Sequence, residues 1–282
     1  MAEVSVVITT YDRPDYLPGA IETVRNQTRT PSEILVVDGG SATGYADEIA
    51  DRYEGVATIR AAEPITLGGA RNRGLDATDG DYIAFLDDDD RWAETKLDRQ
   101  VRRLERRRDA GLATCRKVVV GPDGGVLTCD RTAPAGDLSR AILVSNVIGS
   151  LSKVLFRREA VGAARFDEAL ATKEDWDFLI PRCQDWPVAG VDEPLLVRTE
   201  HRSLSSDVEA VERDATAVIR KHRTLLRERS VAGRAAAALQ AELGRKSLGT
   251  GDRAAARAHL AEAARREPSL RTLGLLGLAT VP

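Results

Sequence analysis

Four consecutive aspartates at residues 87–90 are the feature of this sequence that points most directly to chemistry. They follow an apolar run at residues 82–86 that reads as a buried strand. Adjacent carboxylates repel one another and destabilise a fold unless a cation or a polar ligand balances them. Oxygen ligands with no His or Cys nearby favour Mg²⁺ or Mn²⁺, which keep positions open for water and substrate phosphates. A metal and a diphosphate-bearing substrate are therefore the first hypothesis, and an acidic loop that caps a helix beginning near Trp92 is the alternative.

The elements that must position these carboxylates follow a βαβ pattern. From residue 4 to about 110, short β-branched runs alternate with longer amphipathic stretches, which is typical of a mostly parallel sheet flanked by helices. The expected strands span residues 4–9, 33–37, 57–60 and 82–86, and the expected helices span residues 14–27, 46–53 and 69–77. Asp12 is expected to cap the first helix. Ligands bind outside the carboxyl ends of such strands, where residues 9–12, Asp38 and the acidic run all lie.

Composition narrows the class of protein. Of the 282 residues, 43% are hydrophobic, which is enough for a packed core and excludes a disordered chain. A net charge of −3 produces no basic field, so nucleic acid is not an expected partner. Cys115, Cys129 and Cys183 are too widely spaced for a metal site and odd in number, which favours a reduced, cytoplasmic protein. The start of the chain also lacks the positive region of a signal peptide.

Membrane contact is judged from the apolar segments. None reaches the roughly 18 apolar residues of a membrane span. The stretch at residues 273–281 could touch a membrane surface or close a helical pack, and packing is favoured because the stretch is short and has no basic flank in the sequence. The expected location is therefore the cytoplasm or the cytoplasmic face of a membrane.

Several short motifs between residue 4 and about residue 205 occur in an order known from one enzyme family. They read VVITTYDRP at residues 6–14, VVDGGS at 36–41, GARNRG at 69–74, FLDDDDRW at 85–92, FDE at 166–168 and KEDWD at 173–177. With these motifs the chain resembles a family 2 glycosyltransferase of the GT-A fold. The resemblance implies a GT-A domain at residues 1–205, with a nucleotide-sugar half at about 1–110 and an acceptor half at about 111–205.

The resemblance implies an inverting, hexosyltransferase-type enzyme that uses Mn²⁺ or Mg²⁺. Its donor would be a nucleotide-diphosphate sugar, more often UDP-linked than GDP- or dTDP-linked, and its acceptor a hydroxyl of a glycan or a lipid-linked saccharide. Asp175 matches the general base, with Glu174 as its neighbour, and adjacent carboxylates raise one another's pKa toward neutrality. Both acids could also simply form the first turn of a helix. A non-catalytic nucleotide-sugar-binding protein, or a scaffold that uses the C-terminal helices, is the alternative function.

The resemblance also implies roles for individual side chains. Those expected at the nucleotide sugar are Thr9, Tyr11, Asp38, Arg71, Asp87, Asp88 and Arg198. Those expected at the metal are Asp89, Asp87 and His201. Tyr11 could instead be an ordinary strand-end aromatic and Arg71 a surface helix residue, and Asp90 could cap the helix near Trp92. Gly39 departs from the family, where a second Asp is frequent, which leaves the preferred base open.

Residues 206–282 depart from the catalytic pattern and are expected to form a helical extension. The expected helices span residues 210–229, 232–246 and 254–266. Their small residues and Pro268 resemble one tetratricopeptide-type hairpin. One such repeat cannot form a solenoid. It is therefore expected to pack on the enzyme, or to help it form a homodimer or dock.

Overall fold

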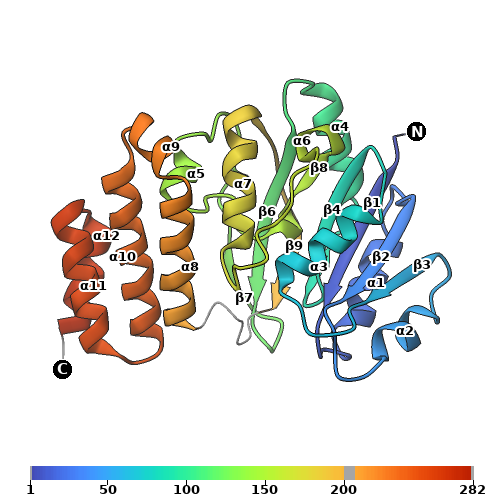
Figure 1. Ribbon diagram of the computed structural model, residues 1–282, viewed down its shortest axis with the longest axis horizontal. Helices are drawn as coiled ribbons and strands as arrows, with labels where there is room; N and C mark the ends of the chain where they lie inside the picture. Colours follow the sequence, from blue (N-terminus) through green and yellow to red (C-terminus); the bar gives the residue numbers. More distant parts are fainter. Residues whose placement is uncertain (1, 200–206, 281–282) are drawn as a thin grey trace.

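The computed structural model describes residues 2–199 and 207–280 and is built around one nine-stranded sheet (Figure 1). The expected alternation of strands and helices is confirmed in the first half of the chain. Its strands are β1 (Val4–Thr10), β2 (Glu33–Asp38), β3 (Val56–Arg60) and β4 (Tyr82–Asp87). Its helices are α1 (Leu17–Arg25), α2 (Tyr45–Ala50) and α3 (Leu67–Asp76). These four strands are parallel, in the order β3-β2-β1-β4, so their carboxyl ends meet at one edge of the sheet.

The second half of the sheet is mixed. β8 (Leu155–Arg157) pairs antiparallel with β4, and β6 (Leu112–Val120) pairs antiparallel with β8. β9 (Val188–Thr199) runs parallel to β6, and β5 (Asp90–Trp92) pairs antiparallel with β9. β7 (Val126–Cys129) forms a hairpin with β6. The helical elements of this half are α4 (Lys96–Arg106), α5 (Ala141–Val144), the 3₁₀ turn η1 (Leu151–Lys153), α6 (Arg158–Val161) and α7 (Glu174–Asp185).

Two local expectations are wrong. Asp12 does not cap α1, which begins at Leu17. Instead it has a φ of 50°, and its carboxylate accepts a hydrogen bond from the backbone N–H of Ala42, which joins the loops after β1 and β2. No helix begins near Trp92, because residues 90–92 form β5 and α4 begins at Lys96. Asp90 is therefore a buried strand residue and not a helix cap.

Side chains of β1 alternate between two hydrophobic cores, one on each face of the sheet. Val6 and Ile8 pack with α1 and α4, and Val7 packs on the face that holds α3 and α7. α3 approaches β1 closely because residue 74 is glycine, and a Cβ there would collide with Cγ1 of Val7. This close approach fixes the position of the helix that carries Arg71.

The C-terminal helices stack beyond α7 at one end of the molecule (Figure 1). They are α8 (Val208–Lys221), α9 (Arg223–Glu228), α10 (Ala232–Gly249), α11 (Arg253–Arg266) and α12 (Leu270–Thr280). Helices α8, α9 and α10 contribute to the same core as α7, whereas α11 and α12 belong to a separate small cluster around Leu260. Among the described residues, no helix is both long and apolar enough to span a membrane.

Candidate active site

A cavity of about 780 Å³ opens at the carboxyl ends of the parallel strands. Its wall combines the loops after β1 and β4, helix α3, the start of α7 and one side of α10. The sequence-predicted residues in this wall are Thr9, Tyr11, Arg71, Asp87, Asp88, Asp89, Glu174, Asp175 and Arg198. Asp38 is not part of the wall although Gly39 is, and His201 lies outside the described residues. The fold thus gathers motifs from both halves of the chain around one space.

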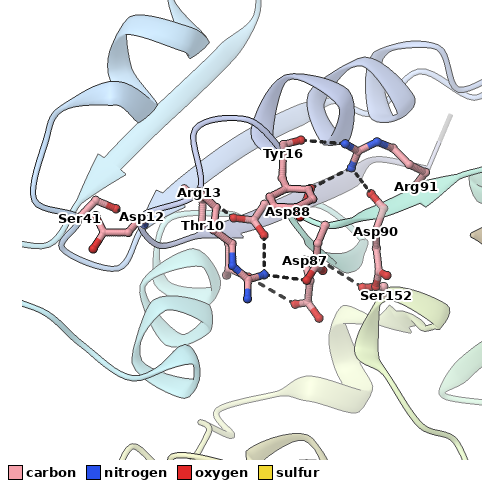
Figure 2. A network of polar contacts seen from close by, with 12 residues as sticks. Thr10, Asp12, Arg13, Tyr16, Ser41, Asp87, Asp88, Asp90, Arg91 and Ser152 are labelled. Carbon is pink, nitrogen blue, oxygen red and sulfur yellow. Dashed lines mark hydrogen bonds and ion pairs between the residues drawn. The ribbon is translucent and has the colours of Figure 1, made fainter. Parts of the chain in front are cut away.

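The four aspartates of the acidic run have different surroundings. One carboxylate oxygen each of Asp87, Asp89 and Asp90 lies within 4.8 Å of the others, which makes this cluster a candidate cation site. Asp88 instead accepts a hydrogen bond from the Thr10 hydroxyl at 2.7 Å. Figure 2 shows Asp88 between Thr10 and Arg13, with Asp90 beside Ser152. Asp87 ends β4 and Asp90 begins β5, so the turn between the two strands brings Asp90 back beside Asp87 and leaves Asp88 on the side of Thr10.

Arg13 places positive charge against the acidic run. Its Nη1 lies 2.7 Å from Oδ2 of Asp89 and 3.3 Å from Oδ1 of Asp88. Burial nevertheless raises the pKa of Asp88 to about 6, against the effects of the Thr10 hydrogen bond and the Arg13 charge. Burial, followed by the charge of Asp87, raises the pKa of Asp90 to about 7. Burial therefore disfavours the charged forms of Asp88 and Asp90 more strongly than their polar neighbours stabilise them.

The donor set fits a hard divalent cation. It consists of carboxylate oxygens alone, as Mg²⁺ and Mn²⁺ prefer. Oδ1 of Asp90 is buried and has no hydrogen-bond partner among the described residues, which is costly for a polar atom unless a ligand satisfies it. These two observations support Asp87, Asp89 and Asp90 as the residues that would hold the ion.

Arg71 lies at the junction between the two halves of the site, and it is not a surface residue. Its side chain is 2% exposed, with Nη2 at 2.8 Å from Oδ1 of Asp87 and Nη1 at 2.6 Å from Oε1 of Glu174. Burial alone would lower the pKa of Arg71, but the charges of Asp87 and Glu174 outweigh it and raise the pKa above its ordinary value. Arg71 therefore joins the acidic run to the start of α7.

Asp175 lies in the first turn of α7, where acids are favoured by the helix dipole. Its Oδ2 accepts a hydrogen bond from Nδ2 of Asn146 at 3.0 Å, and its Oδ1 accepts one from the backbone N–H of Trp176 at 2.6 Å. Burial and the neighbouring charge of Glu174 raise the pKa of Asp175 to about 7. A carboxylate with this pKa, in a cavity wall, can accept a proton at neutral pH.

The loops after β1 and β2 form the other end of the cavity. Tyr11 is 47% exposed, and its ring lies beside Gly39. Oδ1 of Asp38 accepts hydrogen bonds from the backbone N–H groups of Gly40 and Ser41 and from the Ser41 hydroxyl. Gly40 has a φ of 94°, which suits glycine in this tight turn. Asp38 thus shapes the loop through Oδ1, while its Oδ2 lies 3.6 Å from Nε of Arg60 and forms an ion pair with it.

Several wall residues had no role in the sequence interpretation. They are Arg13, Lys117, Asn146, Lys173, Glu242 and Lys246. Lys173, with a φ of 66°, precedes the two acids of α7, and its Nζ lies 2.6 Å from Oε1 of Glu242 on α10. Arg13 in the first motif and Lys173 in the motif KEDWD were the two available signals. The others come from distant segments that only the tertiary fold brings together.

Known proteins share both the sequence pattern and the fold. Residues 5–161, more than half of the chain, match the family described as glycosyl transferase family 2. The amylovoran biosynthesis glycosyltransferase AmsB of Erwinia amylovora is 30% identical over 187 residues, which cover 62% of each chain. The putative teichuronic acid biosynthesis glycosyltransferase TuaG of Bacillus subtilis is 30% identical over 61% of this chain and 68% of its own. The match with AmsB thus spans less than two thirds of that protein's length.

Among solved structures, residues 1–349 of S. aureus TarS in complex with UDP-GlcNAc align with 97% of this chain and 84% of that chain. The TM-score is 0.62 at 16% sequence identity, which shows a shared GT-A fold. The expected fold class, α/β with further C-terminal helices, is therefore confirmed. Together with the match over residues 5–161, these findings show that the chain belongs to glycosyl transferase family 2.

Proposed function

We propose that the protein is an inverting glycosyltransferase that moves a hexosyl group from a UDP-linked donor to a hydroxyl of a growing glycan. The observation that carries the proposal is one cavity with two kinds of acidic group: an oxygen cluster suited to a cation, and Asp175 with a pKa of about 7. Sugar transfer with inversion needs both charge neutralisation at the leaving group and a base for the acceptor.

Each side chain then has a definite task. Tyr11 stacks on the base, and Asp38, paired with Arg60, holds the neighbouring loop after β2 in position for the nucleoside. Thr9, Asp88 and Arg198 belong to the wall around the sugar nucleotide. When bound, the Mn²⁺ or Mg²⁺ ion neutralises negative charge on the leaving diphosphate.

Asp175 is the proposed general base. Its ionised carboxylate takes the proton from the acceptor hydroxyl as the hydroxyl oxygen attacks the sugar. The hydrogen bonds from Asn146 and Trp176 hold the carboxylate in place. Arg71 is paired with Glu174, and burial together with the charge of Glu174 raises the pKa of Asp175 to about 7.

The acceptor belongs, in this proposal, to a cell-surface polysaccharide built in the cytoplasm, including one on a lipid carrier. AmsB and TuaG are named for amylovoran and teichuronic acid biosynthesis, which supports a polysaccharide product. TarS has been solved with UDP-GlcNAc, which supports a UDP-linked donor. The thiols of Cys115, Cys129 and Cys183 are free, as suits a reducing compartment.

Calorimetric titration with UDP, GDP and dTDP, each with Mn²⁺ or with a chelator, tests the donor site. We expect UDP to bind in the presence of Mn²⁺. With the chelator, its affinity should fall by about tenfold or more. Absence of binding by all three nucleotides would contradict the donor assignment. Asp175→Asn should then keep UDP binding but lower the transfer rate by about 10²- to 10⁴-fold.

Asp185→Asn, the same substitution at the opposite, exposed end of α7, is the matched control and should leave both measurements unchanged. Full transfer by Asp175→Asn would exclude Asp175 as the base. UDP binding without transfer to any acceptor, in the unsubstituted protein, would favour the nucleotide-sugar-binding alternative.

A further inference from the structure

Helix α12 leaves one apolar face open to solvent. The side chains of Leu270, Leu273 and Leu278 are 91%, 49% and 63% exposed. Their spacing, with Gly274 and Gly277 between them, places all five residues on one face of the helix. A Cβ built at either glycine would meet no atom within 4 Å, so the surface between the leucines is open. We call these five residues the outer face of α12.

The opposite side of α12 is already occupied. Ala279 is 1% exposed and packs in the small cluster with Ala256 and Leu260 of α11. Packing of residues 273–281 was expected from the sequence, and this inner side shows it for the described part of the stretch. The helix is therefore apolar on both sides. Its inner side packs against α11, and its outer face stays exposed. An exposed apolar surface of this kind marks an interaction site more often than a chance exposure.

Basic residues lie on α12 and on the neighbouring helix α10. α12 contains Arg271 and no acidic residue. α12 also packs against α10, and both Arg271 of α12 and Arg245 of α10 are exposed. Lys and Arg outnumber Asp and Glu across residues 207–280, although the whole chain has a net charge of −3. The sequence expectation of no basic flank is therefore wrong, because Arg271 lies just before the stretch and Arg245 adds a second basic residue from α10.

We propose that the outer face of α12 docks on an anionic lipid surface, with its leucines among the acyl chains and Arg245 and Arg271 at the headgroups. Apolar side chains with a basic border are the combination that binds helices to such surfaces. A second copy of the chain fits less well. In a two-fold dimer the same patch meets itself, so the arginines of both copies would approach one another. Docking on lipid requires neither a sugar donor nor an acceptor.

Co-sedimentation of the full chain with lipid vesicles tests this proposal without donor or acceptor. Vesicles of phosphatidylcholine are compared with vesicles in which a third of the lipid is phosphatidylglycerol. We expect binding to the anionic vesicles that weakens as salt is added. The double variant Leu270→Ser/Leu273→Ser should lower the partition coefficient by about tenfold or more. Arg245→Gln/Arg271→Gln should lower it by about tenfold on anionic vesicles only.

Val126→Ser/Leu127→Ser is the matched control, because these side chains are 68% and 52% exposed on the β7 hairpin. It should bind vesicles like the unsubstituted protein. UDP titration on the same samples separates this test from that of the proposed function. Failure of the unsubstituted protein to bind anionic vesicles would overturn the proposal, as would undiminished binding by the leucine variant. A dimer in sedimentation velocity that the leucine variant abolishes would assign the face to a second copy instead.

Discussion

Arg71 is shared between two carboxylates that belong to opposite halves of the catalytic region. It is almost fully buried, and both of its terminal nitrogens are engaged, one by Asp87 and one by Glu174. A neutral replacement would leave two carboxylates near each other without their common counter-charge. Arg71→Met should therefore lower the free energy of unfolding by about 3–5 kcal/mol in urea titrations.

Arg73→Met, two residues further along α3 and only partly buried, is the control for this substitution. It should change the free energy of unfolding by less than about 1 kcal/mol. If Arg71→Met and Arg73→Met lowered the free energy of unfolding equally, the ion pairs of Arg71 with Asp87 and Glu174 would contribute nothing specific to stability.

The raised pKa of Asp175 predicts how the transfer rate depends on pH. Only the ionised carboxylate can accept a proton, and the pKa of about 7 means that the group is mostly protonated at lower pH. The rate should therefore rise with pH and level off above 7, and it should fall about tenfold for each pH unit below 7. A profile of kcat/KM for transfer, flat from pH 5 to 8, would argue against Asp175 as the titrating group.

Asn146 should affect how the transfer rate depends on pH. Its Oδ1 accepts a hydrogen bond from the backbone N–H of Gly149, which fixes the amide so that Nδ2 points at Asp175. This donor favours the charged carboxylate, so Asn146→Ala should raise the pKa of Asp175 and move the rising limb of the pH profile to higher pH. A uniform loss of rate, without a shift along the pH axis, would indicate damage to the loop alone.

At the scale of elements, helix α3 depends on a glycine at its contact with β1. A methyl group at Gly74 would collide with Val7 in the core, so Gly74→Ala should lower the free energy of unfolding by about 1–3 kcal/mol. Gly233→Ala offers the same substitution in α10 with open space around the new methyl group. It should raise stability by about 0.5–1 kcal/mol, because alanine favours a helix. Thermal or urea unfolding of both variants checks the opposite signs.

Elements with a strong local pattern could be predicted, and elements defined by distant pairing could not. β1 to β4 and α1 to α3 show their alternation within the sequence, and their bounds agree with it within a few residues. β5 has only three residues and is a strand because it pairs with β9, which no local pattern reveals. Asp90 was misplaced for this reason.

The candidate site also contains residues that could be predicted from local motifs and residues that could not. Its acids could be predicted because each lies in a short motif at a strand or helix end. The bridge made by Arg71 could not be predicted, since it depends on how α3 and α7 pack. The wall residues Glu242 and Lys246 could not be predicted either, because they belong to a helix that carries no motif of the catalytic region.

At the scale of the whole molecule, the C-terminal helices differ in how closely they join the catalytic region. α10 contributes Leu239 and Leu243 to the main core and lines the cavity, whereas α11 and α12 form a cluster of their own. A domain boundary near residue 205 remains a prediction. The division into two hydrophobic clusters favours a domain boundary after α10. A protein ending at residue 249 should fold and bind UDP, whereas one ending at residue 229 should unfold at a lower temperature and lose binding.

Thermal unfolding and UDP calorimetry on the two shortened proteins provide the measurement. If the protein ending at residue 229 kept the stability and the affinity of the full chain, α10 would be a separate module. If the protein ending at residue 249 failed to fold, the cluster of α11 and α12 would be as essential as the main core.

The pairing of β5 with β9 sets the order in which the site can form. Asp90 and its partner Arg198 are about a hundred residues apart in the chain, and contacts over such separations form late because closing the intervening loop costs entropy. A nascent chain therefore exposes its acidic run long before β9 leaves the ribosome. Until then Asp90 has no strand partner, whereas Arg13 and Arg71 can already pair with the other aspartates of the run. The cation cluster should thus be a product of the last folding steps and not a nucleus for the first.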